Sequence, residues 1–308
     1  MSSINSGFGF NSTASDVSAG IDFTGKRVVI TGGASGIGIE TARAFAAIGA
    51  EVTLAVRNLD AAATVVADLR AGTGNDNIHL ARLDLANMAT IADFAHQWRG
   101  PLDVLVNNAG IMALPALERT SEGWEMQFAT NHLGHFALAQ ALHPALTEAG
   151  NARVVSLSSS GHLFSPVLFD DPHFNFIPYD PFVAYGQSKT AAALFAVGLT
   201  RRWANDGITS NAVMPGAIAT KLQRHTGRLR TPVERRKTPQ QGAATTLYVA
   251  TAPALEGIGG RYFEDVNEAP LVDHRGPDYT GVAPYALDSA HAERLWDLSL
   301  ELLSEQQA

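Results

Sequence analysis

Short apolar runs rich in β-branched residues alternate with longer segments of helical periodicity along most of this chain. A run of about four to eight such residues indicates a buried strand, and apolar residues recurring every three or four positions indicate a helix. The pattern predicts strands at residues 28–30, 52–56, 77–83, 102–106, 153–157, 208–214 and 260–263. It predicts helices at residues 37–48, 59–69, 88–98 and 124–146, one through residue 185, and one near the C-terminus.

Single helices between successive strands predict a parallel sheet, because such crossovers pack back onto the face of the sheet. The expected fold class is α/β, a doubly wound parallel sheet in three α/β/α layers. No linker or repeat interrupts residues 25–308, so we expect a single domain there, with substrate loops at 160–184 and 219–238. Residues 1–24 are expected to form a flexible or surface-wrapping extension, because Ser, Asn and Gly dominate them.

Composition narrows the class of protein. The net charge of −8 argues against a surface for nucleic acid or for an anionic membrane. The chain has no cysteine, which excludes disulfides, thiolate catalysis and Cys-ligated metals. No apolar run approaches the ~20 residues of a membrane span, and the N-terminus lacks a signal-peptide pattern. We therefore expect a cytoplasmic protein.

A glycine-rich segment, Thr31-Gly32-Gly33-Ala34-Ser35-Gly36-Ile37-Gly38, lies between the first predicted strand and the first predicted helix. Glycines at this place permit a tight turn and let a pyrophosphate approach the backbone at a helix N-terminus. Glycines also terminate strands without binding anything, but the strand–turn–helix context favours a dinucleotide site.

Tyr185 and Lys189 stand one helical turn apart and so share a helix face. A phenol titrates near pH ~10, and a neighbouring ammonium favours the phenolate and lowers that pKa. Such a pair can serve as a general acid and base. The same spacing also occurs by chance on helix surfaces, so its meaning depends on the other motifs.

Four motifs in this order resemble the short-chain dehydrogenase/reductase family in its classical form, from about Gly25 to the C-terminus. They are Thr31 to Gly38, Asn107-Asn108-Ala109-Gly110, Tyr185 with Lys189, and Pro215-Gly216. Within the family the chain is most similar to the retinol-dehydrogenase-like branch, on Asn131 to Phe136, Gly260 to Phe263 and Arg294 to Ser299. The resemblance implies a Rossmann fold and a nicotinamide cofactor.

The resemblance also implies a set of cofactor-binding residues. One of them, Asp84, has an alternative role as an acidic residue near a helix N-terminus. The implied set is Gly32, Ser35, Gly36, Ile37, Gly38, Arg57, Asp84, Leu85, Asn108, Ala109, Gly110, Tyr185, Lys189, Pro215, Gly216, Ile218 and Thr220.

The end of the second predicted strand bears on which cofactor binds. Members of the family that prefer NAD carry an acidic residue there to hold the ribose hydroxyls. Here Val56 occupies that place and Arg57 follows. A guanidinium suits a 2′-phosphate through bidentate, charge-assisted hydrogen bonds, so we predict NADP(H). The alternative is that Arg57 is an ordinary solvated loop charge.

By resemblance, the catalytic residues are Asn131, Ser159, Tyr185 and Lys189. Ser159 would bind the carbonyl oxygen, Tyr185 would protonate it, and Lys189 would lower the Tyr185 pKa and bind the nicotinamide ribose. Asn131 would bind a water on the proton path to Lys189. The assignment of the serine could be displaced by one, to Ser158 or Ser160.

The segment between Ser159 and Tyr185 is longer than in compact family members and rich in aromatic residues. Aromatic side chains bury large apolar areas, so they suggest a wide hydrophobic pocket, although they could instead pack the loop onto the protein. They are Leu163, Phe164, Phe169, Phe174, Phe176, Ile177, Tyr179 and Phe182.

Other charged residues fit no further site. His132 and His135 are expected to pack within their helix. His162, Asp170, Asp171 and His173 lack the periodicity of metal ligands, and no metal is predicted. The basic residues between 221 and 237 are interpreted as a solvated lid, or alternatively as contacts to an acidic substrate. These are Lys221, Arg224, Arg228, Arg230, Arg235, Arg236 and Lys237.

The sequence therefore predicts an NADP(H)-dependent oxidoreductase that interconverts a bulky hydrophobic ketone or aldehyde and its alcohol. The alternatives are an NAD(H)-dependent alcohol or steroid dehydrogenase, and a non-catalytic NADP(H)-binding sensor. A light-dependent protochlorophyllide reductase is disfavoured because such enzymes generally use site cysteines. The family usually forms homo-oligomers, and a dimer and a tetramer both stay open.

Overall fold

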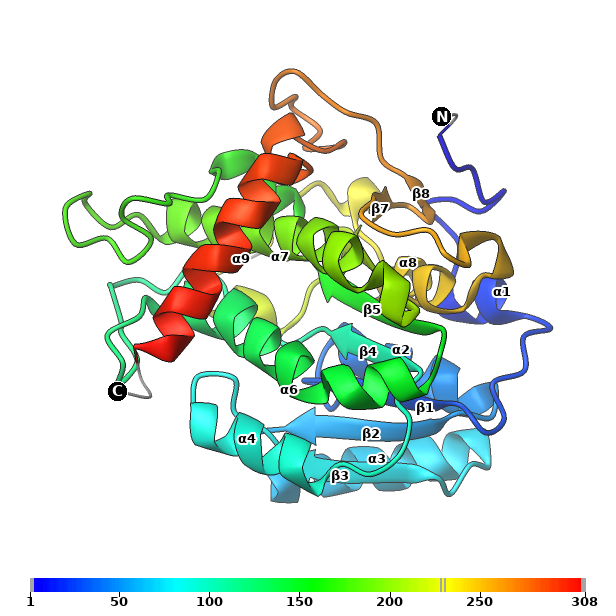
Figure 1. The fold of residues 1–308 in the computed structure, drawn as a ribbon. Helices are drawn as coiled ribbons and strands as arrows, with labels where there is room; N and C mark the ends of the chain where they lie inside the picture. The colour runs from blue at the N-terminus through cyan, green and yellow to red at the C-terminus, as the bar shows by residue number, and fades with distance from the viewer. Residues whose placement is uncertain (1–2, 228, 230, 306–308) are drawn as a thin grey trace.

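A sheet of eight strands forms the centre of the molecule, in the order β3-β2-β1-β4-β5-β6-β7-β8 (Figure 1). The computed structural model describes residues 3–227, 229 and 231–305. The strands are β1 Arg27–Thr31, β2 Glu51–Val56, β3 Ile78–Arg82, β4 Val104–Asn107, β5 Ala152–Leu157, β6 Ile208–Met214, β7 Tyr262–Glu264 and β8 Asn267–Glu268.

Strands β1 to β7 pair in parallel, as the alternation of strands and helices predicts. Strand β8 pairs with β7 in the antiparallel sense and was not predicted. Its two residues are too few to produce a readable hydrophobic period. A two-residue turn, Asp265 and Val266, joins the two strands.

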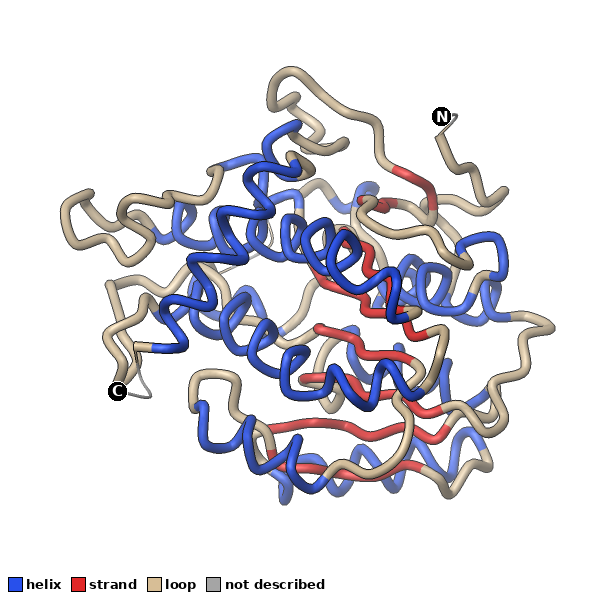
Figure 2. Tube along the Cα trace, viewed as in Figure 1, coloured by secondary structure: helices blue, strands red, loops and turns tan. Residues whose placement is uncertain are grey.

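Helices cover both faces of the sheet, which gives the predicted three layers (Figure 2). Helices α2, α3 and α8 pack on one face, and α4, α6, α7 and α9 pack on the other. The α-helices are α1 Ala14–Ser18, α2 Ile37–Ala47, α3 Leu59–Thr73, α4 Met88–Gln97, α5 Met126–Phe128, α6 Gly134–Glu148, α7 Pro181–Trp203, α8 Pro239–Thr251 and α9 Ser289–Ser304.

Strand β1 shows how the sequence supplies both layers. Successive side chains of a strand point to opposite faces of the sheet. Accordingly, Val28 and Ile30 pack into the core beneath α2 and α8, whereas Val29 packs into the core beneath α4 and α6. All three are fully buried. A central parallel strand is covered on both faces, and it therefore requires a continuous apolar run.

Strand β1 is flanked by β2 on one side and β4 on the other, so the chain reverses its direction of travel across the sheet at this point. The connections after β1 and after β4 therefore diverge to opposite faces. A crevice opens between them at the carboxyl ends of the strands, which is where open α/β sheets bind ligands.

The predicted helix at 124–146 is interrupted. Residues Met126–Phe128 begin it as α5, Ala129–Leu133 form a π-helical turn, and Gly134–Glu148 continue it as α6. Asn131 lies in this π-helical turn. Such turns are frequently found at functional positions. Helix α8 was not predicted, although Thr238 and Gln241 form a capping box at its start.

The N-terminal residues are packed against the protein. Helix α1 begins at a capping box formed by Thr13 and Asp16 and lies against α8. Before it, Ile4 and Ser6 donate backbone hydrogen bonds to the side chains of Glu268 and Asn267. The sequence left open whether this segment is flexible or wraps the surface. In the structure it wraps the surface, because these polar contacts and the buried face of α1 hold it.

No helix among the described residues is both long enough and apolar enough to cross a membrane.

Candidate active site

A cavity of about 1180 Å³ opens at the carboxyl ends of the strands, above the point where the sheet reverses direction. It is somewhat larger than the ~300–1,000 Å³ of most small-molecule sites. All but two of the predicted site residues line it. The exceptions are Gly38 and Asn131, which lie behind its wall.

The glycine-rich turn forms one end of the cavity. Gly36 adopts φ 54° and directly precedes α2, and no side chain caps that helix. Among the first amides of α2, that of Gly38 donates to the carbonyl of Ser35 at 3.0 Å, so an anion would meet the remaining ones at this helix N-terminus. Gly38 lies behind them, and a Cβ there would be 2.7 Å from the carbonyl oxygen of Gly32. Gly38 is thus needed for the tight packing of the turn.

Asn108 braces this turn against β4. Its side-chain amide donates to the carbonyl of Thr31 at 2.7 Å, and the Thr31 hydroxyl accepts from the amides of Asn108 and Ala109. His135 contacts the same hydroxyl through Nε2 at 2.9 Å. Burial lowers the pKa of His135 to about 4, so this histidine is neutral and structural, as predicted for the helix.

Ser159 and Tyr185 meet at the other end of the cavity. Both side chains border Gly161, where a Cβ would be 3.4 Å from the Ser159 hydroxyl oxygen, and Tyr185 is 4% exposed. Ser159 ends the strand β5 segment and caps the short 3₁₀ helix η2 (Ser160–Phe164), whose Gly161 amide donates to the Ser159 hydroxyl at 3.0 Å. A Cβ at Gly161 would be 2.7 Å from the Tyr185 ring, so a glycine is required for this approach.

Lys189 lies one turn beyond Tyr185 on α7, with its ammonium 5.7 Å from the centre of the Tyr185 ring. Burial raises the pKa of Tyr185 to about 12, against the hydrogen bond with Ser159, and burial lowers the pKa of Lys189 to about 8. The prediction of a lowered Tyr185 pKa is therefore wrong in direction. Taking the phenolate out of water outweighs the attraction of an ammonium at this distance.

The Lys189 ammonium donates to the carbonyl of Leu157 at 2.8 Å. Asn131 stands beside it across Gly110, where a Cβ would be 3.2 Å from Asn131 Oδ1 and 3.6 Å from Lys189 Nζ. The Asn131 side chain accepts from the amide of Ile111 and donates to the Ser188 hydroxyl, both at 2.9 Å. The structure thus brings Asn131, Ser159, Tyr185 and Lys189 together.

The three serines of this region have different neighbours. Ser158 is buried and also lines the cavity, but its hydroxyl donates to the carbonyl of Lys189 at 2.8 Å. Ser160 begins the 3₁₀ helix η2, and Ser159, not Ser160, is the serine whose side chain opposes the rise in the Tyr185 pKa. The geometry favours Ser159 as the residue that can share a carbonyl oxygen with Tyr185.

Arg57 and Asp84 lie at the far end of the same cavity. Arg57 follows β2 directly, is exposed, and lines the cavity next to Asn58, the N-cap of α3. Asp84 also lines it, and its carboxylate accepts from the amide of Ala86 at 3.1 Å. Asp84 does not cap α4, because Asn87 does.

Two aromatic residues of the long loop reach the cavity, Phe164 and Phe182. They lie beside Tyr279: the ring centroid of Phe164 is 6.1 Å from that of Phe182 and 5.7 Å from that of Tyr279. Phe169 instead packs on His291, and Phe176 is 91% exposed. The residues of the predicted set that do not line the cavity are Leu163, Phe169, Phe174, Phe176, Ile177 and Tyr179.

The histidine and acidic residues of the long loop have structural roles. His162 donates through Nδ1 to the carbonyl of Ser159 at 2.7 Å and accepts from the amide of Ala283. The Asp171 carboxylate accepts from three amides, those of residues 175–177. Across the described residues, no group of three or more His, Asp or Glu side chains is placed to hold a metal ion.

The basic lid contributes part of the cavity mouth. Lys221, Arg224 and Arg235 line it, and Arg235 pairs with Asp278 at 2.5 Å. Arg236 is turned toward the carbonyl oxygens of Leu229 and Thr231. Arg228 and Arg230 lie outside the described residues.

Sequence reasoning missed several residues that line the cavity. Phe10 comes from the N-terminal segment, Asp265 follows β7, and residues 277–280 come from a late loop. The sequence holds no signal for them, because each reaches the site through contacts between segments far apart in the chain. Thr238 with Gln241 could have located the start of α8 beside Lys237.

Comparison with known proteins gives a consistent result. The family described as short chain dehydrogenase matches residues 26–230. A protein of Streptomyces lividans named as an oxidoreductase is 52% identical over 298 residues, covering 92% of this chain and 99% of that protein. The polyprenol dehydrogenase of Mus musculus is 40% identical over 260 residues, covering 80% of this chain and 77% of that protein.

Among solved structures, an uncharacterised protein from Mycobacterium paratuberculosis superposes with a TM-score of 0.74. It is 32% identical in sequence, and the match covers 96% of this chain and 98% of that one.

Proposed function

The chain belongs to the short-chain dehydrogenase family, and we propose that it is an NADP(H)-dependent member that interconverts a bulky hydrophobic ketone or aldehyde and its alcohol. The family resemblance and the Rossmann-type fold expected from the sequence are confirmed, including the likeness to the retinol-dehydrogenase-like branch. The observation that carries the proposed activity is the placement of Ser159 beside Tyr185, with Lys189 one turn away, at the wall of the large cavity.

The residues present fit a dinucleotide. No side chain caps the N-terminus of α2, where a pyrophosphate would bind, and Gly36 before it faces Thr220, which a Cβ at Gly36 would approach to 3.4 Å. At one end Arg57 offers a guanidinium for a 2′-phosphate. At the other end the loop from Pro215 to Thr220 borders Tyr185 and Lys189, where the nicotinamide and its ribose would lie.

The chain's residues supply the proton side of the reaction, whereas the bound nicotinamide supplies or accepts the hydride. In reduction, the Ser159 hydroxyl donates a hydrogen bond to the carbonyl oxygen, and the Tyr185 phenol gives that oxygen its proton. A Tyr185 pKa of about 12 keeps the phenol protonated at neutral pH, which suits a proton donor. The Lys189 ammonium then stabilises the phenolate that is left.

The cofactor preference rests on Arg57 and on Val56, which replaces an acidic residue. The test is kcat/KM with NADPH and with NADH for the wild type and for Arg57→Ala. We expect the wild type to prefer NADPH and Arg57→Ala to lose most of that preference, because the 2′-phosphate loses its bidentate partner. Arg201→Ala, a change at an exposed residue of α7, is the matched control. A wild-type preference for NADH would refute the assignment.

The substrate class rests on the three rings of Phe164, Phe182 and Tyr279 at the cavity wall. Edge-to-face rings offer an apolar surface for a bulky carbonyl compound. A screen of NADPH oxidation over aliphatic, aryl and steroidal ketones tests this, with Tyr185→Phe as the inactive control. Activity confined to small, charged ketones would refute a wide apolar pocket.

An NAD(H)-dependent alcohol or steroid dehydrogenase is the alternative enzyme. A non-catalytic NADP(H) sensor is disfavoured, because a sensor needs no contact between Ser159 and Tyr185. Near-wild-type turnover by Tyr185→Phe with intact NADPH binding would refute the proposed mechanism. That the protein is cytoplasmic, and that it forms a homodimer or homotetramer, are predictions from the sequence.

A further inference from the structure

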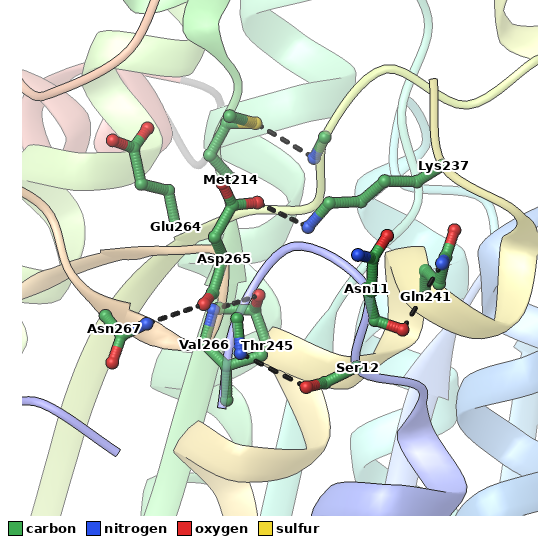
Figure 3. A network of polar contacts seen from close by, with 12 residues as sticks. Asn11, Ser12, Met214, Lys237, Gln241, Thr245, Glu264, Asp265, Val266 and Asn267 are labelled. Atoms are coloured by element: carbon green, nitrogen blue, oxygen red, sulfur yellow. Dashed lines mark hydrogen bonds and ion pairs between the residues drawn. The ribbon is translucent and has the colours of Figure 1, made fainter. Parts of the chain in front are cut away.

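Lys237 is a buried cation beside the main cavity. Its side chain is 1% exposed, and its ammonium lies 2.5 Å from the Asp265 carboxylate, an ion pair seen in Figure 3. An ammonium withdrawn from water is costly unless it is paired, so the Asp265 carboxylate is what permits this burial. Both residues border the cavity, yet neither belongs to the proposed catalytic set.

The stem of Lys237 supports the loop at the nicotinamide end of the site. Gly216 adopts φ 98°, and a Cβ there would be 2.7 Å from Lys237 Cδ. The backbone amide of Lys237 donates to the carbonyl of Ala217 at 2.9 Å. The Lys237 side chain therefore lies directly on the backbone of Gly216, within the loop that borders the reacting groups.

Asp265 is held rigidly in the turn between β7 and β8. Asp265 and Val266 adopt φ 48° and 65°, which is unfavourable for residues other than glycine, above all for a β-branched one. Two hydrogen bonds hold the turn: the Val266 amide donates to the Thr245 hydroxyl at 3.1 Å, and the Asn267 side chain donates to the Asp265 carbonyl at 2.8 Å. Figure 3 shows these contacts beside the ion pair.

Phe10 covers the ion pair from the N-terminal segment. Its ring centroid is 5.1 Å from the Lys237 ammonium, within the range of a cation–π contact. The segment is fixed on both sides of Phe10, because Asn267 donates to the carbonyl of Phe8 and Gln241 donates to the carbonyl of Asn11. Phe10, Lys237 and Asp265 all lie outside residues 26–230, the part that matches the family pattern.

We propose that Phe10, Lys237 and Asp265 form a clasp that positions the Pro215–Ile218 loop for the nicotinamide end of the cofactor. All three are positioning residues, because they act through the loop. Because the clasp fixes the loop before the dinucleotide binds, binding loses less conformational entropy of the loop. The inference rests on the proposed function and adds residues outside the family pattern to it.

The test separates the two ends of the cofactor. Calorimetry would give Kd for NADPH and for 2′-phospho-ADP-ribose, which shares the adenine and phosphate contacts but lacks the nicotinamide. We expect Lys237→Ala to weaken NADPH binding about tenfold and to leave the fragment within about twofold of the wild type. A residue with a merely structural role would weaken both ligands alike or neither.

Two further variants complete the design. Lys26→Ala removes a lysine that pairs with Asp103 at the opposite end of the sheet, and it should leave both dissociation constants unchanged. Phe10→Ala removes the cover without leaving a buried charge, and it should weaken NADPH binding about threefold and spare the fragment. If Lys237→Ala does not fold, Phe10→Ala decides the question.

The outcomes distinguish the clasp from the proposed function. If the wild type binds NADPH and the ratio of the two dissociation constants is unchanged in the folded clasp variants, the clasp is refuted and the proposed function stands. If the wild type binds neither NADPH nor NADH, the proposed function fails and the clasp fails with it.

Discussion

At the scale of single residues, adjacent serines at the end of β5 have opposite tasks. The Ser159 hydroxyl faces Tyr185 and the cavity. The Ser158 hydroxyl points into the protein and donates to the carbonyl of Lys189. Consecutive residues in extended backbone place their side chains on opposite sides, so one serine serves the site and the other anchors the helix that carries Lys189.

This division gives a pair of matched substitutions. Ser159→Ala should lower kcat about 10²–10³-fold, because the developing oxyanion loses a hydrogen-bond donor, and should cost about 1 kcal/mol of unfolding free energy through loss of the η2 cap. Ser158→Ala should instead cost about 1–3 kcal/mol of unfolding free energy, because a buried carbonyl loses its donor. Steady-state kinetics and urea unfolding of both variants would measure this. A larger loss of kcat in Ser158→Ala would reverse the assignment.

At the scale of elements, the position of Asn131 depends on how its helix begins. Glu125 is fully buried and caps α5 by accepting from the amides of Gln127 and Phe128. The π-helical turn that carries Asn131 follows at once. Burial raises the pKa of Glu125 to about 7, against these hydrogen bonds and the nearby Arg119.

The raised pKa makes stability depend on pH. Because the folded state holds the Glu125 proton more tightly than the unfolded state, the free energy of unfolding should fall as pH rises from about 4.5 to about 7. A shift of this size corresponds to about 3 kcal/mol. Glu125→Gln has no such proton, so its stability relative to the wild type should rise across that range. Urea unfolding at pH 5 and pH 8 measures the change.

Glu118→Gln is the control for that experiment, because Glu118 is exposed and belongs to the same segment. Its stability relative to the wild type should stay constant between the two pH values. An equally flat difference for Glu125→Gln would show that Glu125 is ionised normally in the folded protein.

The elements also show what the sequence could predict. The strand at residues 52–56 was predictable because a single buried apolar run defines it. The helix at residues 37–48 was predictable because a single buried face defines it. Helix α8 was missed because it is buried almost all round, which leaves no polar face to reveal its period. The sequence located most aromatic residues of the long loop as buried or loop residues, but it did not predict which way their side chains point. Those directions depend on contacts with α9 and with Gln127.

At the scale of the whole molecule, the chain ends contribute to opposite layers. Helix α9 packs on α7 through Trp296, which contacts Phe136 and Phe195. The N-terminal segment packs on α8 and on the β7–β8 hairpin. The N-terminal contacts join residues more than two hundred positions apart, so composition alone could not distinguish a flexible extension from the packed one that the structure shows. The glycine-rich turn, the segment after β4 and the segment after β6 could be placed beside one cavity from the sequence, because they follow strand ends, whose place in such a fold is general.

The N-terminal segment should therefore contribute to stability. Ala14 and Val17 are buried in the core shared with α8, at 4% and 6% exposure. Deleting residues 2–18 exposes that surface and should cost about 2–4 kcal/mol, which lowers Tm by about 5 °C or more. Calorimetry measures Tm, and far-UV circular dichroism should show that the α/β fold persists. Val17→Ser, which keeps the segment but spoils its buried face, should reproduce a large part of the loss. An unchanged Tm in the deletion variant would mean that the segment lies on the protein without stabilising it.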